Sequence, residues 1–373
     1  MRIGLIAPPW VPVPPPAYGG SEVVLDNLAR GLQELGHEVV LFTVGQSTCP
    51  VPRKSFYRDA VEPNGLGVGV LEAAHVLAAY EELADVDIIH DHTVLGPLLA
   101  NRHGLNRAPI VMTNHGPFTR EARRIFGQIA DRTAIVAISH SQARSAIGIP
   151  IAAVIHHGTD LKVYRLGPGD GDYLLFVGRM SPDKGVHRAV RIAKNAGRRL
   201  VIAAKMREPA ERAYFEREVR PLLSTEDEIP CEPPLAQCVE LLRGATALLN
   251  PITWPEPFGL VMIEALASGT PVLAFPNGAA PEIVEHGVTG YLCADEDAAT
   301  AAVGHVADIE RSRCRTAAER RFSLARMARD HERLYLSLLT GGPLTPARTL
   351  GTRRALVPSD LDTQEQPAAG ASV

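Results

Sequence analysis

One stretch of the sequence joins a predicted strand to a predicted helix, and it reads Glu256-Pro257-Phe258-Gly259-Leu260-Val261-Met262-Ile263-Glu264. The apolar run before it, residues 245–250, is typical of a buried strand, and the helical pattern continues to residue 267. Proline just before a helix start suits the backbone there. The first N–H groups of a helix have no partner within it and attract anions. We therefore predict a phosphate site at this helix start, formed by Phe258, Gly259, Leu260 and Val261.

Two carboxylates flank this predicted phosphate site. Glu256 precedes the helix, and Glu264 lies roughly 12 Å farther along its axis. One carboxylate could bind sugar hydroxyls and the other ribose hydroxyls. The alternative is a solvated helix with two surface glutamates. The apolar residues Val261, Ile263 and Leu266 instead predict a mostly buried helix, where a carboxylate needs a partner.

The same alternation of strand and helix runs through most of the 373 residues, a length that exceeds one compact core. Strands are predicted at 3–7, 38–43, 87–90, 109–113, 133–138, 152–155, 173–177, 200–204, 245–250, 271–274 and 289–293. Helices are predicted at 21–35, 184–195, 209–222, 235–242, 258–267 and 323–339. This rhythm predicts an α/β protein with two doubly wound parallel sheets, separated by a Gly/Pro-rich linker at 161–172. Ligands bind in the cleft that such domains form.

We predict domains at 1–165 and 166–320, a C-terminal helix within 321–340, and a tail at 341–373. The tail is rich in Pro, Thr, Ala and Gly and has no aromatic residue, so it is predicted to be disordered.

Two cations stand where the second domain's first strand meets its first helix. Arg179 and Lys184, five positions apart, could reach one diphosphate from two sides and stabilise its charge without a metal. The alternative, two surface cations, leaves their place at a helix start unexplained, because positive charge there opposes the helix dipole. Lys205, at the end of the next strand, is a weaker candidate for the same cleft, and an ordinary exposed lysine is the alternative.

In the first domain, Gly19 and Gly20 precede a helix and form a turn with exposed amides, which could hold the donor phosphate from across the cleft. The alternative is a plain loop-to-helix junction. The turn is not the glycine pattern of a dinucleotide fold, so NAD is not supported.

Histidines gather at the predicted strand ends. His90 and His92 would share one face of a strand, and a metal site is one interpretation. Hydrogen-bonded structural histidines are the other, which we favour because the sequence lacks a matching downstream ligand set. No metal is expected. Glu282 is predicted either to lie near the donor as a supporting group or to be an ordinary helix-start glutamate.

These motifs carry a resemblance. The E-x7-E that begins E-P-F-G, followed by A-L-A-S-G-T-P-V, resembles family 4 of the retaining glycosyltransferases of GT-B fold, and nearly all of residues 1–340 fits that pattern. The resemblance implies two Rossmann-like domains facing a cleft, with the C-terminal helix crossing back to the first domain. It implies that Glu256 contacts the transferred sugar and Glu264 the ribose, with Arg179 and Lys184 as diphosphate clamp. It also implies that His115 lies beside the reacting sugar.

The implied activity is transfer of a hexose from a UDP-, GDP- or ADP-sugar to a hydroxyl acceptor, with retention, a front-face mechanism, and neither metal nor cofactor. Glu256, His115, Arg179 and Lys184 would be catalytic. Rival interpretations are a GT-B phosphorylase, which would need a pyridoxal-binding lysine, and a catalytically silent subunit that binds sugar nucleotides. The base, the sugar, the acceptor and the oligomeric state stay open.

Two departures from the family pattern concern the site. His157 stands where the family usually has Asn, and residues 224–234 replace a short strand and turn beside the expected base-binding wall. The acceptor side, including residues 46–70, resembles nothing that we can assign.

Composition and charge restrict the classes of partner and the cellular compartment that we expect. The net charge of −4 argues against nucleic acid, and five scattered cysteines indicate reduced thiols in a cytoplasm. A predicted helix at 119–126 carries three arginines. It could lie on an anionic membrane or bind an anionic acceptor, and a solvated helix face is the alternative. We therefore expect a cytoplasmic protein with peripheral membrane contact as an option.

Overall fold

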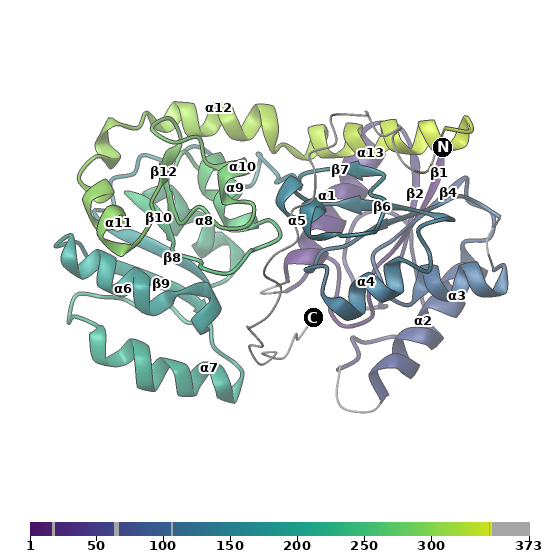
Figure 1. Ribbon diagram of the computed structural model, residues 1–373, viewed down its shortest axis with the longest axis horizontal. Helices are drawn as coiled ribbons and strands as arrows, with labels where there is room; N and C mark the ends of the chain where they lie inside the picture. The colour runs from purple at the N-terminus through teal and green to yellow at the C-terminus, as the bar shows by residue number, and fades with distance from the viewer. Residues whose placement is uncertain (17–18, 63–66, 106, 343, 345–373) are drawn as a thin grey trace, which may run out of the picture.

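The computed structural model describes residues 1–16, 19–62, 67–105, 107–342 and 344. Figure 1 shows two lobes side by side, each with a sheet flanked by helices. We call the lobe that contains the N-terminus the first domain and the other the second domain. Most of the predicted tail, from residue 345 on, lies outside the described residues.

The first domain is built on a seven-stranded sheet in the order β3-β2-β1-β4-β5-β6-β7, and every pair in it is parallel. Its central strands are almost fully buried, because helices cover both faces of such a sheet. The strands are β1 (Arg2–Ile6), β2 (Glu38–Thr43), β3 (Arg53–Ser55), β4 (Ile88–Asp91), β5 (Ile110–Thr113), β6 (Thr133–Ala137) and β7 (Ala153–Val154).

The second domain is built on a five-stranded parallel sheet in the order β12-β11-β10-β8-β9. Its strands are β8 (Leu174–Arg179), β9 (Leu200–Lys205), β10 (Ala247–Asn250), β11 (Val272–Ala274) and β12 (Gly290–Leu292). The carboxyl ends of β8 and β10 lead directly to the two motifs that the sequence singled out. Two doubly wound sheets joined by a linker confirm the predicted fold class.

The α-helices of the first domain are α1 (Gly20–Glu34), α2 (Val68–Glu82), α3 (Gly96–His103), α4 (Arg120–Phe126) and α5 (His140–Ser145). Those that follow are α6 (Val186–Asn195), α7 (Pro209–Tyr214), α8 (Leu235–Gly244), α9 (Leu260–Ala267), α10 (Ala280–Ile283), α11 (Glu296–Val303), α12 (Arg311–Arg321) and α13 (Leu324–Leu339). No helix in the described part of the chain has the length and apolarity needed to cross a membrane.

Two predicted helix starts lie two residues too early, for the same reason. The helix predicted from Lys184 begins at Val186, and the one predicted from Phe258 begins at Leu260. Gly185 (φ 74°) and Gly259 (φ 105°) precede them in left-handed backbone, which glycine adopts without strain. Each helix therefore begins immediately after a glycine turn.

The C-terminal helix crosses back to the first domain. Figure 1 shows α12 along the second domain and α13 continuing over the first, where it packs against α1. The contact is close at Gly31, because a Cβ there would lie 2.7 Å from Cδ2 of Leu324 and 2.9 Å from Cβ of Ala328. At the crossing, Ser323 forms a parallel bridge with Thr159, so the two connections between the domains run side by side.

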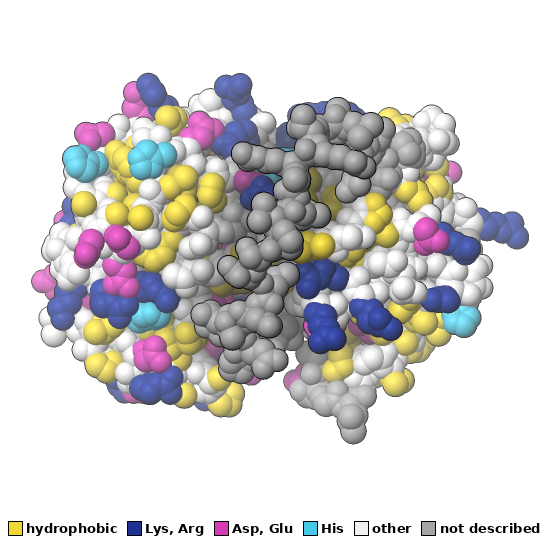
Figure 2. Space-filling view, viewed as in Figure 1, with side chains coloured by type: hydrophobic (Ala, Val, Ile, Leu, Met, Phe, Trp, Pro, Cys, Tyr) yellow, Lys and Arg dark blue, Asp and Glu magenta, His cyan; other side chains and the backbone are white. Residues whose placement is uncertain are grey.

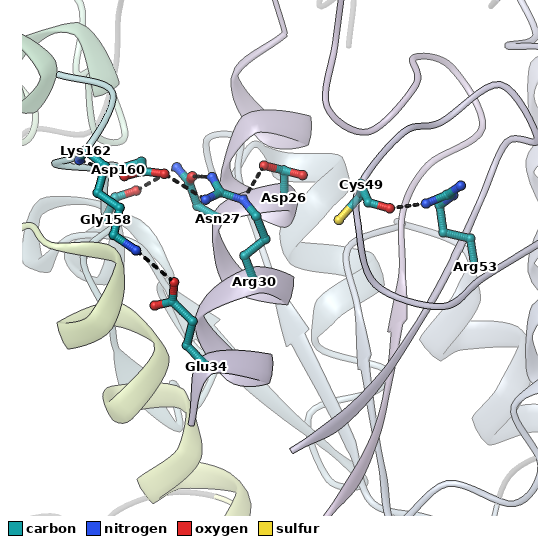
Figure 3. A network of polar contacts seen from close by, with 9 residues as sticks. All are labelled: Asp26, Asn27, Arg30, Glu34, Cys49, Arg53, Gly158, Asp160 and Lys162. Carbon is teal, nitrogen blue, oxygen red and sulfur yellow. Dashed lines mark hydrogen bonds and ion pairs between the residues drawn. The ribbon is translucent and has the colours of Figure 1, made fainter. Parts of the chain in front are cut away.

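A polar network holds the turn before the linker against α1 (Figure 3). The Arg30 guanidinium donates to Asp26 at 2.8 Å and to Asp160 at 2.7 Å, and Asn27 donates to the carbonyl of Gly158 at 3.2 Å. The backbone that carries His157 is thereby fixed to the first domain.

Candidate functional site

The start of α9 places the predicted phosphate site between the two domains. Leu260 packs against the cores of both domains, and a Cβ at Gly20 would lie 3.4 Å from its Cδ1. The Gly19-Gly20 turn at the start of α1 thus faces the start of α9, as its predicted role requires. Two helix N-termini that meet in this way present N–H groups and positive potential to one region.

Phe258 positions this helix start by packing. Its side chain is only 2% exposed, and its ring lies 5.0 Å from that of His157 and 6.2 Å from that of Phe322. We predicted donor contact here. The structure instead shows the ring packed in the core of the second domain.

Lys184 and Glu256, the two central predicted residues, form an ion pair. Lys184 Nζ lies 2.5 Å from Glu256 Oε2, and the two side chains are 12% and 17% exposed. The ammonium also lies 5.5 Å from the centroid of the Trp254 ring. A cation and a carboxylate therefore stand together at the start of α9, and a diphosphate there would compete with Glu256 for the ammonium.

Arg179 ends β8, and its register partner on β9 is Lys205. Arg179 Nη2 lies 3.4 Å from Asp183 Oδ2, whereas Lys205 Nζ lies 3.9 Å from carboxylate oxygens of Glu208 and Glu211. Both cations thus stand at the carboxyl edge of the sheet, in the region where sheets of this kind bind ligands.

Glu264 lies on α9 and is half-buried. Burial raises its pKa to about 7, and a hydrogen bond from the Tyr164 hydroxyl partly offsets that shift. A partly buried carboxylate held by one tyrosine has acceptor capacity left for a ligand. Tyr164 belongs to the linker and was missed, because a single aromatic residue in a loop gives no local signal.

His115 follows β5 and faces the other histidines. Its Nε2 lies 2.8 Å from Nδ1 of His92, and its ring stacks 5.2 Å from that of His157. Burial lowers the pKa of His115 to about 4, so the ring is neutral near pH 7. Because His157 contacts Phe258 in turn, His115 is joined to the start of α9 by one intervening ring.

The metal interpretation of His90 and His92 has no support in the geometry. His90 uses both ring nitrogens, with Tyr335 Oη at 2.6 Å and Thr113 Oγ1 at 2.8 Å. Within the described ranges, no three His, Cys, Asp or Glu side chains are arranged to hold a metal ion.

Glu282 joins the domains. Its carboxylate accepts hydrogen bonds from the backbone N–H groups of His140 at 2.8 Å and Ser141 at 2.6 Å, and it pairs with His156 at 2.9 Å. Burial opposes ionisation, but the hydrogen bonds from His156 and from both N–H groups outweigh it and lower the pKa of Glu282. The sequence offered a supporting or an ordinary role, and the structure shows a link between α10 and the start of α5.

Residues 224–234, which depart from the family's strand-and-turn pattern, alter the sheet less than the sequence suggested. Glu228 and Cys231 form parallel bridges with Val201 and Ala204 on β9. The segment therefore still runs along the outer edge of the sheet, although it forms no continuous strand.

A model described as "Glycosyltransferase Family 4" matches residues 18–163, and one described as "Glycosyl transferases group 1" matches residues 164–330. The chain belongs to the family 4 glycosyltransferases. It is a GT-B enzyme, and the expected family, fold and enzyme class are confirmed.

The chain is similar to known glycosyltransferases over most of their length. D-inositol 3-phosphate glycosyltransferase of Mycobacterium avium (strain 104) is 28% identical, over 88% of this chain and 89% of that protein. AviGT4, a glycosyltransferase involved in avilamycin A biosynthesis, is 26% identical with a TM-score of 0.68, over 91% of this chain and 98% of that one. Anabaena HepE, solved in complex with UDP-glucose, shares the fold with a TM-score of 0.72 at 19% identity, over 91% of this chain and 100% of that one.

Proposed function

We propose that this family 4 enzyme transfers a hexosyl group from a nucleoside diphosphate sugar to a hydroxyl acceptor, with retention and without a metal ion. The observation that carries the proposal is the Lys184–Glu256 pair at the start of α9, opposite the Gly19-Gly20 turn. A diphosphate placed there would meet an ammonium and helix N–H groups, and the sugar would meet a carboxylate.

The reaction that this site fits is a front-face displacement. The bond between the anomeric carbon and the diphosphate oxygen breaks, and its electron pair leaves with the diphosphate. Lys184, Arg179 and the N–H groups of α9 stabilise that charge. The acceptor oxygen forms its bond to the anomeric carbon on the same face, and its proton passes to the departing phosphate oxygen. Glu256 and His115 hold the hexose, and Glu264 holds the ribose.

A binding screen tests the donor. We expect one of UDP, GDP and ADP to bind with a Kd of ~1 μM–1 mM, measured by calorimetry. The matching monophosphate should bind at least about tenfold more weakly, because it lacks the phosphate that Lys184 contacts. Mass spectrometry of reactions with the matching sugar nucleotides then identifies the transferred hexose, and NMR of the product gives its anomeric configuration. Inversion, or a rate abolished by EDTA and restored by a divalent cation, would contradict the mechanism.

The same measurements distinguish a transferase from the two alternatives, a catalytically silent subunit and a phosphorylase. A silent subunit binds a nucleoside diphosphate but yields no transfer product with any sugar nucleotide. A phosphorylase releases hexose 1-phosphate from a glycan and inorganic phosphate, and its bound pyridoxal absorbs visibly in the purified protein.

We further propose that α4 brings the acceptor side of this enzyme to an anionic membrane surface, at the cytoplasmic face. Within the described part of the chain, Arg120, Arg123 and Arg124 form no ion pair, and the first domain exposes clusters of basic side chains in Figure 2. The helix begins only a few residues after His115, so a membrane there would lie near the acceptor. The five free cysteines suit a reducing cytoplasm.

Vesicle sedimentation tests the membrane proposal. We expect binding to phosphatidylcholine vesicles only when phosphatidylglycerol is included, and a roughly 100-fold loss for the triple variant Arg120→Gln, Arg123→Gln, Arg124→Gln, since each arginine contributes about 1 kcal/mol. The matched control removes three exposed arginines of the second domain: Arg212→Gln, Arg217→Gln and Arg220→Gln. Equal binding by both triple variants would refute the role of α4.

A further inference from the structure

A row of histidine rings runs from the C-terminal helix to the site. Neighbouring ring centroids are separated by 5.1, 4.1, 5.1 and 5.2 Å, and the last ring lies 5.0 Å from that of Phe258. In order, the rings are those of His331, His90, His92, His115 and His157. All but His115 are buried, and His115 is partly exposed.

The His92–His115 contact requires a choice of proton position. Burial lowers the pKa of His115 to about 4 and that of His92 well below its ordinary value, so both rings are neutral near pH 7. A neutral imidazole has one N–H and one bare nitrogen. In the 2.8 Å contact between His92 Nδ1 and His115 Nε2, one nitrogen must therefore donate and the other must accept.

The surroundings of His92 decide which nitrogen donates. Its Nε2 is buried without a hydrogen-bond partner among the described residues. If His115 donated, the N–H of His92 would have to sit on that Nε2, as a buried donor with nothing to receive it. If His92 donates from Nδ1, its Nε2 is a bare lone pair. Orphaned buried N–H groups are rarer than under-used acceptors, so the second arrangement is favoured.

The backbone around His115 is held independently of its ring. The Gln142 amide donates to the carbonyl of Asn114 at 2.9 Å and to that of Gly116 at 2.6 Å, on either side of the histidine. Gln142 is itself buried. With the loop fixed in this way, the hydrogen bond from His92 sets the orientation and the tautomer of the ring.

We infer that His92 is a positioning residue that holds His115 as the Nδ1–H tautomer, so that His115 presents a hydrogen-bond donor to the hexose. The inference rests on the proposed function and adds to it which atom of His115 acts on the substrate. Nδ1 of His115 has no hydrogen-bond partner in the described ranges, and it belongs to the one partly exposed ring of the row. An N–H there can donate to a hydroxyl oxygen of the transferred sugar, whereas a bare nitrogen can only accept.

Two substitutions of nearly equal size separate this role from simple packing. In His92→Asn, the amide nitrogen reaches roughly the position of Nδ1 and can still donate to His115 Nε2. In His92→Asp, the carboxylate can only accept, so the proton of His115 must move to Nε2. We expect the asparagine variant to keep kcat within about threefold of wild type. We expect the aspartate variant to lose about 10- to 100-fold in kcat, with a smaller change in KM.

The tautomer is also measured directly, without turnover. Two-bond ¹⁵N–¹H spectra of histidine-labelled protein distinguish Nδ1–H from Nε2–H, and the signal that disappears in His115→Gln assigns the ring. We expect Nδ1–H in wild type and in His92→Asn, and Nε2–H in His92→Asp. The control is His103→Asp, an exposed histidine of the same domain, which should change neither the spectrum of His115 nor kcat.

The outcomes distinguish the inference from the proposed function. An Nε2–H signal for His115 in wild type, or equal activity of the asparagine and aspartate variants, overturns the positioning role and leaves the transferase proposal intact. If wild type transfers no hexose from any sugar nucleotide, the proposed function fails, while the spectrum still decides the tautomer.

Discussion

Lys184→Met is expected to lower kcat about 10²–10³-fold, the usual loss when one fixed group that stabilises transition-state charge is removed. Methionine keeps much of the length and packing of the lysine stem but has no charge. The leaving diphosphate would then lose the cation that lies at the start of α9. The measurement is kcat at saturating sugar nucleotide, with Lys194→Met, an exposed lysine on α6, as the matched control.

The ion pair makes a second variant necessary. Lys184→Met leaves the carboxylate of Glu256 unpaired in a site where it is only 17% exposed, which costs stability in its own right. The double variant Lys184→Met, Glu256→Gln removes both charges and should regain the lost stability in denaturant unfolding. It should stay as inactive as the single variant. Near-normal kcat in either protein would remove Lys184 from the mechanism.

Glu264→Gln is expected to stabilise the fold and to weaken donor binding. The folded-state pKa of Glu264 is about 7, above its ordinary value of 4.5, so the folded protein binds this proton more tightly than the unfolded chain does. The stability that the protonated form contributes is present below pH 4.5 and is lost as pH rises towards 7. The neutral amide avoids that loss and should raise the free energy of unfolding by about 1–3 kcal/mol at pH 8, and by less than about 1 kcal/mol at pH 5.

Binding of the nucleoside diphosphate to Glu264→Gln should weaken, although the stability of this variant rises. An ionised Glu264 can accept hydrogen bonds from ribose hydroxyls, and losing this charge should weaken nucleoside diphosphate binding about 10- to 100-fold. In wild type, binding should weaken as pH falls from 8 to 6, because the carboxylate becomes protonated. Glu240→Gln, on the exposed face of α8, is the control. If Glu264→Gln binds the nucleotide as wild type does, the carboxylate does not hold the ribose.

Local patterns predicted most of the architecture. Short apolar runs bounded by Gly or Pro correspond to nearly every strand, because parallel strands are buried on both faces. The exception is β3, whose Arg53-Lys54-Ser55 has no apolar residue and lies at the edge of the sheet. The predicted helix ranges contain no counterpart for α2, α3, α5, α10, α11 and α12. In α2, apolar residues surround the helix on nearly every face between Val68 and Tyr80, so the helical spacing of apolar positions is lost.

The site was predictable only in its parts. The glycine turns and the charges beside them mark Lys184 and Glu256 separately, but the two residues are 72 positions apart in the sequence and no local feature shows that they touch. The Tyr164–Glu264 and His92–His115 contacts were hidden for the same reason. They arise where strand ends and the linker converge, which is a property of the folded chain.

The paired connections between the domains govern how this cleft can move. Thr159 N–H donates to the carbonyl of Phe322 at 2.8 Å, and Leu324 N–H donates to the carbonyl of Thr159 at 3.1 Å. Two chain connections that are hydrogen-bonded along one line form a hinge axis. They permit rotation of the domains about that line and resist sliding or twisting across it. Arg326 also donates to the carbonyl of His157 at 2.9 Å, so the His157 ring, which contacts Phe258, lies next to this hinge axis. Rotation of the domains would therefore change the far side of the cleft most and disturb the contacts of His157 least.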